Sequence, residues 1–409
     1  MTSSPRPTTA LPNLRVLEVA SLIPGPYCGK LLASLGATVI KAEPPNAGDL
    51  SRRRGPFPND VPHPERSGLY LYLNTGKQSI TLNLHDLAGR DLLRQLVARV
   101  DMVVHDYTPA NAAAVGLDEP SLRAANPNVI IVPATPFGST GPYADYRAGH
   151  LATFHAGGEG WLLPNGVALD TFPDRPPIVA GANMGDYQAG LTAAVGALAA
   201  VHHRLANPDA SAGQMVDASS QEAQLSVGYM PIQRHESEGI TETRFSRYFR
   251  VGGVLPASDG YVELLTLEPR QFQGLLEFMG NPDWASPEMF SDPATHGPEL
   301  NRHMRDWFSQ HTREWLYAEG QAHGVPVAPY YTPSEVFASP QQRERDFYAT
   351  VNHPETGPLE YTGAPFQLSE TPTTLTRASL LGEHNADVYC GLLGYAPQEL
   401  AALRRAGAV

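Results

Sequence analysis

The stretch "LRVLEVASLIPGPYCGKLLASLGATVIKAE" (residues 14–43) decides the fold class. Its first seven residues, Leu14 to Ala20, form a short apolar run that is typical of a buried strand. A helical segment follows from Pro26 to Gly36, with proline at its start and glycine at its end, and Thr38 to Glu43 is again strand-like. A strand, a helix and a second strand form the unit from which parallel sheets are built.

The same pattern recurs along the first half of the chain. Residues 79–84, 101–106 and 129–135 predict further buried strands, and residues 87–100 predict a helix with Leu92, Leu93 and Leu96 on one face. A long helix of small residues suited to close packing is expected at 187–206. We therefore predict an α/β fold in which a Rossmann-like, doubly wound parallel sheet forms a large domain.

The signals change after this long helix. Residues 225–330 predict a strand pair followed by three helices, a mixed pattern that indicates a smaller α+β domain. We expect the N-terminal part of the large domain to span residues 1–224. The proline-rich residues 331–409 form either an extended wrap or a segment that returns to the large domain, and we expect the return.

Composition excludes several classes of partner. The net charge is −13 and is spread without a run of lysine and arginine, which argues against nucleic acid or an anionic membrane as the partner. The two cysteines, Cys28 and Cys390, lie near opposite ends of the chain and predict no disulfide framework. The first ten residues lack the apolar core of a signal peptide and no apolar run has the length of a membrane span, so we expect a cytoplasmic protein.

Common cofactor motifs are missing. The sequence contains neither GxGxxG after its first strand nor GxxxxGK[ST], so no NAD or flavin is expected. HExxH and GxSxG are missing too, and the adjacent pair His202 and His203 at the polar end of the long helix is not interpreted as a metal site. We expect no metal.

A family resemblance extends over nearly the whole chain. The opening stretch, "NTGKQSITLNL", "DMVVHDYTPANAAAVGLD", "NPNVIIVPATPFGSTGPYAD", "GQMVDASSQEA" and "LLGEHNADV" occur in the order found in class III CoA-transferases. The chain resembles this CaiB/BaiF-type family, which includes the alpha-methylacyl-CoA racemases. The resemblance implies a Rossmann-like large domain, a small middle domain, an interlocked homodimer, and acyl-CoA and a carboxylic acid as substrates.

The resemblance directs attention to the segment "RAGHLATFHAGG". Transferases of the family use an aspartate that attacks the acyl-CoA to form a mixed anhydride and then carries CoA as a thioester. One alignment puts His150 at the aspartate position, and a shift of one residue matches His150 to the racemase histidine, with Leu151 replacing the aspartate. Both alignments lack the carboxylate there, so Asp145, Glu159 and Asp186 are the candidate replacements.

The racemases suggest a second interpretation of the same residues. Their bases move a proton at the carbon beside the thioester, and His150 and Asp186 match such a pair, with Glu268 as the residue that holds the histidine. Simpler roles remain open, because Asp186 and Glu268 both stand where a helix start favours an acidic residue, and His150 is also compatible with a loop histidine.

The resemblance also implies a binding site for coenzyme A, formed by Lys41, Arg52, Asn74, Lys77 and Tyr107. Cationic side chains are the expected partners of its phosphates. Gln78 and Thr108 replace arginines that are usual in the family. We expect a CoA-transferase; the alternatives are a racemase, epimerase or isomerase acting at the α-carbon of an acyl-CoA, and a CoA-thioester binding protein with altered chemistry.

Overall fold

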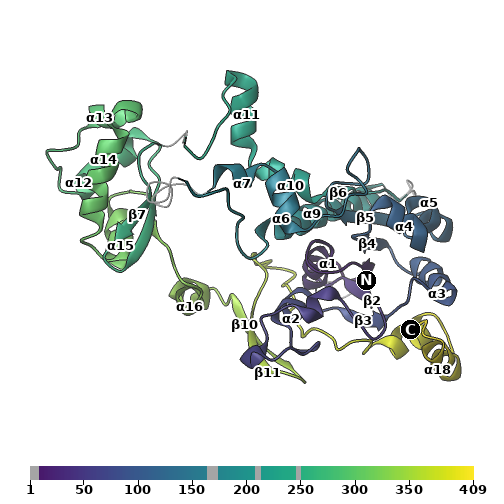
Figure 1. Cartoon of the computed structure of the whole chain (residues 1–409). Helices are drawn as coiled ribbons and strands as arrows, with labels where there is room; N and C mark the ends of the chain where they lie inside the picture. The colour runs from purple at the N-terminus through teal and green to yellow at the C-terminus, as the bar shows by residue number, and fades with distance from the viewer. Residues whose placement is uncertain (1–8, 164–173, 208–212, 246–249) are drawn as a thin grey trace, which may run out of the picture. The chain divides into compact units, whose positions relative to one another are not determined.

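The computed structural model describes residues 9–163, 174–207, 213–245 and 250–409. Contacts divide the chain into two compact units. The first contains residues up to 157, residues 180–227 and residues 343–409, and the second contains residues 158–179 and 228–342. Each unit has a core of its own, and both are shown in Figure 1.

The first unit is built on a six-stranded sheet in the order β3-β2-β1-β4-β5-β6. Every neighbouring pair is parallel, which confirms the predicted parallel α/β sheet. This is the strand order of doubly wound dinucleotide-binding folds, in which the winding direction reverses between the first and fourth strands. The strands are β1 (Arg15–Val19), β2 (Thr38–Glu43), β3 (Gln78–Thr81), β4 (Met102–His105), β5 (Ile130–Thr135) and β6 (Ala218–Ser219).

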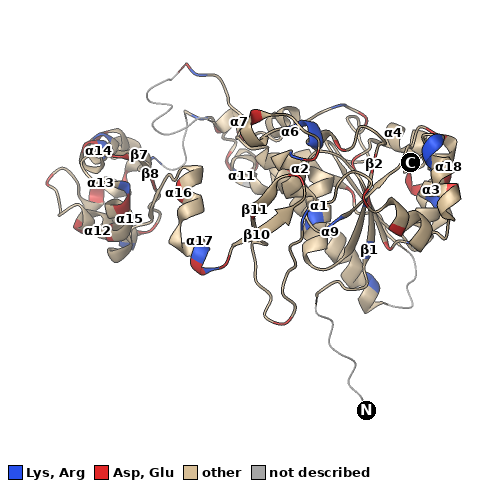
Figure 2. Ribbon diagram, turned by 90° about the horizontal axis from the view of Figure 1, so that it is seen from below, with Lys and Arg blue, Asp and Glu red and all other residues tan. Residues whose placement is uncertain are grey.

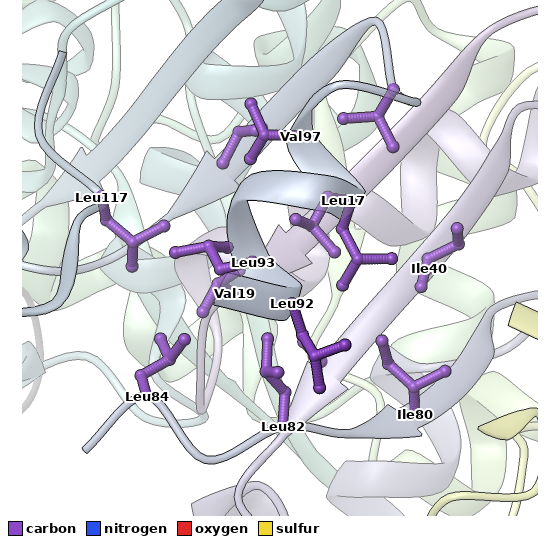
Figure 3. Close-up of a cluster of buried hydrophobic side chains, with 14 of the residues drawn as sticks. Leu17, Val19, Ile40, Ile80, Leu82, Leu84, Leu92, Leu93, Val97 and Leu117 are labelled. Carbon is purple, nitrogen blue, oxygen red and sulfur yellow. The ribbon is translucent and has the colours of Figure 1, made fainter. Parts of the chain in front are cut away.

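One face of the sheet is covered by α3 (Leu87–Val97), and the side chain of the preceding residue, Asp86, caps its first turn. Figure 3 shows its leucines against the strands: Leu92 and Leu93 are about 1% exposed and pack with Leu17 of β1 and Ile80 of β3. Burying one such leucine stabilises the fold by roughly 1.5–3 kcal/mol. The predicted apolar face of this helix is therefore the one that contacts the sheet.

The other face is covered by α1 (Pro24–Ser34) and α9 (Met184–Ala206). Small residues let the two helices approach closely, since a Cβ added to Gly190 would lie 2.6 Å from the carbonyl oxygen of Pro24. Helix α9 begins at Met184, three residues before the predicted start at Tyr187. The preceding Asn183 has φ of 56°, a left-handed conformation that does not continue a right-handed helix. This places Asp186 inside the first turn rather than ahead of it.

The C-terminal segment belongs to the first unit. It forms a two-stranded hairpin, a π-helix and a last helix that lies beside α3 (Figures 1 and 2). The hydroxyl of Tyr389 donates to the carbonyl of Thr81 at 2.6 Å, and the amide of Gln95 donates to the hydroxyl of Tyr395 at 2.8 Å. The elements are β10 (Tyr348–His353), β11 (Gly357–Thr362), η3 (Ala386–Leu392) and α18 (Pro397–Arg405).

The second unit contains a three-stranded antiparallel sheet and several helices around one apolar core. The predicted strand pair is present as β7 and β8. The proline-rich stretch after Val325 adds a third strand, β9, which was not predicted for this sheet. The elements are α7 (Glu159–Leu162), α11 (Tyr229–Glu238), β7 (Gly253–Ala257), β8 (Gly260–Leu264), α12 (Pro269–Phe278), α13 (Pro287–Ser291), α14 (Pro293–Phe308), α15 (Arg313–Ala322), β9 (Val327–Pro329) and α16 (Pro333–Ala338), with α17 (Pro340–Glu344) at the boundary.

Short elements of the first unit were not predicted, because a helix of eight residues or fewer is too short to show a clear period in sequence. The unpredicted elements are α2 (Gly68–Leu73), α4 (Pro109–Val115), α5 (Glu119–Ala125), α6 (His150–Ala156), α10 (Ser220–Val227) and the short 3₁₀ helices η1 (Leu50–Arg53) and η2 (Pro58–Asp60).

Basic and acidic segments are interspersed over both units (Figure 2). None of the described helices has the length and apolarity needed to cross a membrane.

Candidate active site

The loop after β1 lies where the winding direction of the sheet reverses, the place where open α/β sheets bind ligands. Two carboxylates hold this loop. The N–H of Ser21 donates to Asp106 at 2.8 Å, and the N–H of Leu22 donates to Asp49 at 3.1 Å. Leu22 has φ of 60°, in the left-handed region that residues with a side chain rarely adopt. The two aspartates thus stabilise a strained turn at this edge of the sheet.

Asp106 follows the end of β4 and was not singled out from the sequence. Burial, with a further contribution from Asp49, raises its pKa to about 7, although the Ser21 N–H opposes the shift. The preceding His105 is fully buried, and burial lowers its pKa to about 4, so this imidazole is neutral at pH 7. Only the neighbouring Tyr107 had been predicted here, and it is half-buried against the α3 side of the core.

Below the loop, two of the predicted CoA-binding residues join a buried ionic cluster. Nζ of Lys41 lies 2.8 Å from Glu18 and 2.6 Å from Asp49, and Nζ of Lys77 lies 2.8 Å from the second oxygen of Glu18. Burial alone would raise the pKa of Asp49, but Lys41 lowers it to about 2. Asn74 accepts a hydrogen bond from Lys77 at 2.9 Å.

Arg52 belongs to a second buried cluster. It is 1% exposed, and its guanidinium contacts Glu43 at 2.7 Å and Glu65 at 2.5 Å while lying 3.6 Å from the ring centroid of Tyr70. Removing one partner from such a cluster leaves an uncompensated buried charge, at a cost of about 3–5 kcal/mol. The structure therefore places Lys41, Arg52, Asn74 and Lys77 in the interior, paired with protein groups.

Two unpredicted cations stand next to Arg52 on the surface. Arg53 and Arg54 are exposed, and no ion pair with a carboxylate is formed by either within the described part of the chain. Arg54 is close enough to Asp186 to lower the pKa of that carboxyl. The signal for them in the sequence was the run "SRRR", in which only the first arginine was singled out.

His150 and Asp186 come together, although 35 residues separate His150 from the first turn of α9. The N–H of Gly185 donates to Nε2 of His150 at 3.1 Å. His150 is the first residue of α6. Because it is hydrogen-bonded to the first turn of α9, it is not a free loop histidine. Asn183 donates to Oδ2 of Asp186 at 3.4 Å, and the carboxylate is half-buried in the turn where the helix dipole favours negative charge.

The two groups influence each other's ionisation. Burial lowers the pKa of His150, and Asp186 opposes the shift. Burial raises the pKa of Asp186, and His150, Asn183 and Arg54 oppose that shift. The neutral imidazole can accept the Gly185 hydrogen bond only through an unprotonated Nε2, so its own proton resides on Nδ1.

The remaining candidates occupy different environments. Asp145 is exposed and accepts a hydrogen bond at 2.8 Å from the N–H of Ala110, at the start of α4. Glu268 lies in the second unit, exposed at the start of α12 and 2.5 Å from Arg270, as expected of a helix-capping residue. Glu159 begins α7 in the same unit, and burial raises its pKa.

A cavity of about 600 Å³ opens beside the first turn of α9. It is lined by tyrosines from four elements, and Tyr187 follows Asp186 directly. The rings of Tyr27 and Tyr187 meet edge to face with centroids 5.0 Å apart. No motif marks these residues, since they are scattered over the sequence. The lining residues are Tyr27, Gly68, Leu71, Tyr72, Tyr187, Leu359, Glu360, Tyr361 and Thr362.

CoA-transferase family III matches residues 11–385 of the chain. The chain belongs to this family. This class III CoA-transferase is 32% identical to succinyl-CoA–D-citramalate CoA-transferase of Chloroflexus aurantiacus, over 98% of each chain. It is 29% identical to formyl-CoA:oxalate CoA-transferase of Streptomyces avermitilis, over 98% of this chain and all of that one. It is 30% identical to succinyl-CoA:mesaconate CoA-transferase of Haloarcula hispanica, over 93% of this chain and 95% of that one.

Among solved structures, this class III CoA-transferase is similar to a CaiB/BaiF family protein from Brucella suis, with 28% identity and a TM-score of 0.79 over 94% of this chain and all of that one. The family resemblance inferred from the sequence is thereby confirmed, and the chain is an enzyme of the CoA-transferase type. Enzymes of this type use CoA thioesters as substrates. No group of three His, Cys, Asp or Glu side chains within the described ranges is arranged to hold a metal ion.

Proposed function

We propose that this CoA-transferase moves CoA from an acyl-CoA to a short dicarboxylic acid, with Asp186 as the attacking carboxylate. The observation that supports this assignment best is the position of Asp186, half-buried in the first turn of α9, beside His150 and next to the tyrosine-lined cavity. The other candidates are less suitable as the nucleophile. Asp145 is exposed and accepts a hydrogen bond from the N–H of Ala110 at the start of α4, and Glu159 belongs to the second unit.

The proposed reaction has four steps. A carboxylate oxygen of Asp186 attacks the thioester carbon, the C–S bond breaks, and CoA thiolate leaves a mixed anhydride behind. The thiolate then attacks the carbonyl carbon of Asp186, releasing the donor acid and forming an aspartyl thioester. The acceptor carboxylate displaces CoA to give a second anhydride, and attack of the thiolate on the acceptor acyl carbon yields the new acyl-CoA and free Asp186.

The surroundings of Asp186 suit these steps. Burial raises the pKa of this carboxyl, and a more basic carboxylate is a better nucleophile as long as it stays ionised. Arg54 and the first turn of α9 favour the ionised form. His150 acts as a positioning residue, because its Nε2 accepts the N–H of the residue before Asp186.

The dicarboxylic acceptor follows from the relatives, whose names all include a dicarboxylic acid or its thioester: citramalate, oxalate, mesaconate and succinyl-CoA. For CoA itself, we propose the crevice at the ends of β1 and β4, with Tyr107 at its edge. Arg53 and Arg54 are the cations proposed to contact its phosphates. In this arrangement Lys41, Arg52, Asn74 and Lys77 support the crevice from below.

We also propose the interlocked homodimer. The chain passes between its two units at four points, after residues 157, 179, 227 and 342. Each crossing leaves a segment that connects the two units, and we propose that a second chain passes between these connecting segments.

The covalent role of Asp186 is tested by trapping. Incubating the enzyme with an acyl-CoA and then with hydroxylamine converts an aspartyl thioester or anhydride to a hydroxamate, which peptide mass spectrometry locates. We expect the label on Asp186 and expect Asp186→Asn to lower CoA transfer by a factor of about 10⁴ or more. Asp145→Asn is the matched control and should keep activity. A label on another carboxylate, or full activity of Asp186→Asn, would refute the assignment.

A racemase is the second candidate, because His150 and Asp186 are two adjacent titratable groups. Acyl-CoA incubated in deuterated water without any acceptor acid distinguishes the two reactions. Deuterium at the α-carbon favours the racemase, whereas a new thioester formed only with added acid favours CoA transfer.

A further inference from the structure

The chain contains only three lysines, Lys30, Lys41 and Lys77, and all are buried in the first unit. Lys41 and Lys77 have carboxylate partners in Glu18 and Asp49. Lys30 is 7% exposed, and within the described part of the chain its Nζ meets only a neutral group, the hydroxyl of Thr75 at 2.9 Å. A buried cation without a counter-ion is costly, and an anionic ligand nearby would offset the cost.

Lys30 acts on the tyrosine-lined cavity through one of its walls. Its Nζ lies 4.4 Å from the ring centroid of Tyr72, which lines the cavity. The amine thus puts a positive charge directly behind this wall of the cavity, where it attracts an anion bound against Tyr72. Burial, with a contribution from Lys77, lowers the pKa of Lys30 to about 8, so the amine is still mostly protonated at pH 7.

A second wall of the cavity carries a hydroxyl for which the described part of the chain offers no hydrogen-bond partner. Tyr361 of β11 is 6% exposed, and its hydroxyl makes no hydrogen bond within the described residues. Buried hydroxyls are nearly always paired, so an unpaired one in a residue that lines a cavity indicates a group that binds there. The one carboxylate in the lining, Glu360, is held by Arg343 at 2.6 Å and so does not make the cavity anionic.

From these contacts we infer that the cavity holds the acyl group of the substrate and that Tyr361 and Tyr72, with Lys30 behind Tyr72, bind its second, non-reacting carboxylate. The cavity begins at Tyr187, next to the proposed nucleophile Asp186, so one carboxyl of a short dicarboxylic acid reacts at Asp186 while the other reaches the tyrosines. The apolar side chains of Leu71 and Leu359 line the space between and suit the carbon chain. The inference rests on the proposed function and names the residues that select the substrate.

Succinyl-CoA and butyryl-CoA test this assignment, because their acyl groups have the same chain length and differ in the distal carboxylate. Dissociation constants are measured by titration calorimetry in the Asp186→Asn background, where turnover does not interfere. We expect succinyl-CoA to bind about tenfold or more tightly than butyryl-CoA, and Tyr361→Phe and Lys30→Met each to remove most of that preference. Butyryl-CoA and free CoA should bind all variants equally.

The controls keep the test decisive. Tyr361→Phe deletes a hydroxyl that is unpaired among the described residues, and Lys30→Met deletes a charge that has no counter-ion there, so both variants should fold, as melting curves will show. Tyr395→Phe removes a hydroxyl on the α3 side of the sheet and should leave the preference intact. Equal affinity of the parent for both thioesters, an unchanged preference in both variants, or equal loss of free CoA would overturn the inference. Because the readout is binding, none of these outcomes bears on Asp186 as nucleophile, which the hydroxylamine experiment decides.

Discussion

His150 changes the acid–base behaviour of Asp186 as well as its position. In its protonated form, the imidazole lowers the pKa of a carboxyl that burial raises, so the two groups titrate as a pair. The imidazole must also stay neutral to accept the Gly185 N–H, and burial favours its neutral form. Acidification therefore acts on both groups. It protonates the Asp186 carboxylate, and it protonates the imidazole and so breaks the hydrogen bond that orients the helix turn.

A pH profile tests this coupling. Burial raises the pKa of Asp186 above its ordinary value of 3.8, so the acid limb of kcat/KM should lie above that value. His150→Gln retains an acceptor for Gly185 that acid does not remove, so Asp186 alone titrates and we expect the limb to move to lower pH. His150→Ala should lower turnover by a factor of about 100. If both variants keep the wild-type profile and rate, the histidine has no part in the reaction.

The placement of single charged residues was the hardest part to predict. The positions of Lys41, Arg52 and Lys77 matched those of CoA-binding residues, but the sequence does not reveal that Glu18 and Glu43, each in a strand, lie opposite them. Partners across a sheet are set by strand order, which a local pattern does not contain. Asp186 and His150 were both selected, yet their contact depends on α6 and α9 meeting, and α6 was not predicted.

Among the elements, α1 and α9 position the site most directly. They pack through Gly190, where an added methyl group would meet the carbonyl oxygen of Pro24 at 2.6 Å and Cβ of Tyr27 at 2.9 Å. Neither neighbour can move away without shifting α1, which carries Tyr27 and Lys30. The spacing of these two helices thus determines both the cavity wall and the direction of the Asp186 turn.

Gly190→Ala is accordingly expected to destabilise the protein by about 1–3 kcal/mol in denaturant unfolding, despite the better helix propensity of alanine. Gly391→Ala is the matched control, since an added Cβ there has nothing within 4 Å, and it should be neutral or slightly stabilising. A Gly190→Ala protein as stable as wild type would mean that the helices are free to separate. The longer periodic elements, β1, α1, β2 and α3, were predicted within a few residues because their apolar patterns are local properties of the chain.

At the scale of the whole molecule, the proposed interlocking has a kinetic consequence. Subunits that thread through each other cannot part without partial unfolding, so tagged and untagged dimers mixed under native conditions should form no mixed dimers. Mixed dimers should appear after unfolding and refolding the two together. Native mass spectrometry reads both states, and rapid exchange without denaturant, or monomer in sedimentation on dilution, would contradict the interlocked arrangement.

The burial of all three lysines also bears on self-damage. Thioesters and mixed anhydrides acylate free amines, and lysine is the usual site of such acylation in proteins. Burial lowers the pKa values of Lys30 and Lys77 to about 8, so these amines would react readily with any acyl donor that reached them. Because they lie inside the first unit, an activated acyl group that escapes from the enzyme meets no lysine amine on the enzyme's own surface. An enzyme that makes acylating agents in every turnover is in this way protected from its own products.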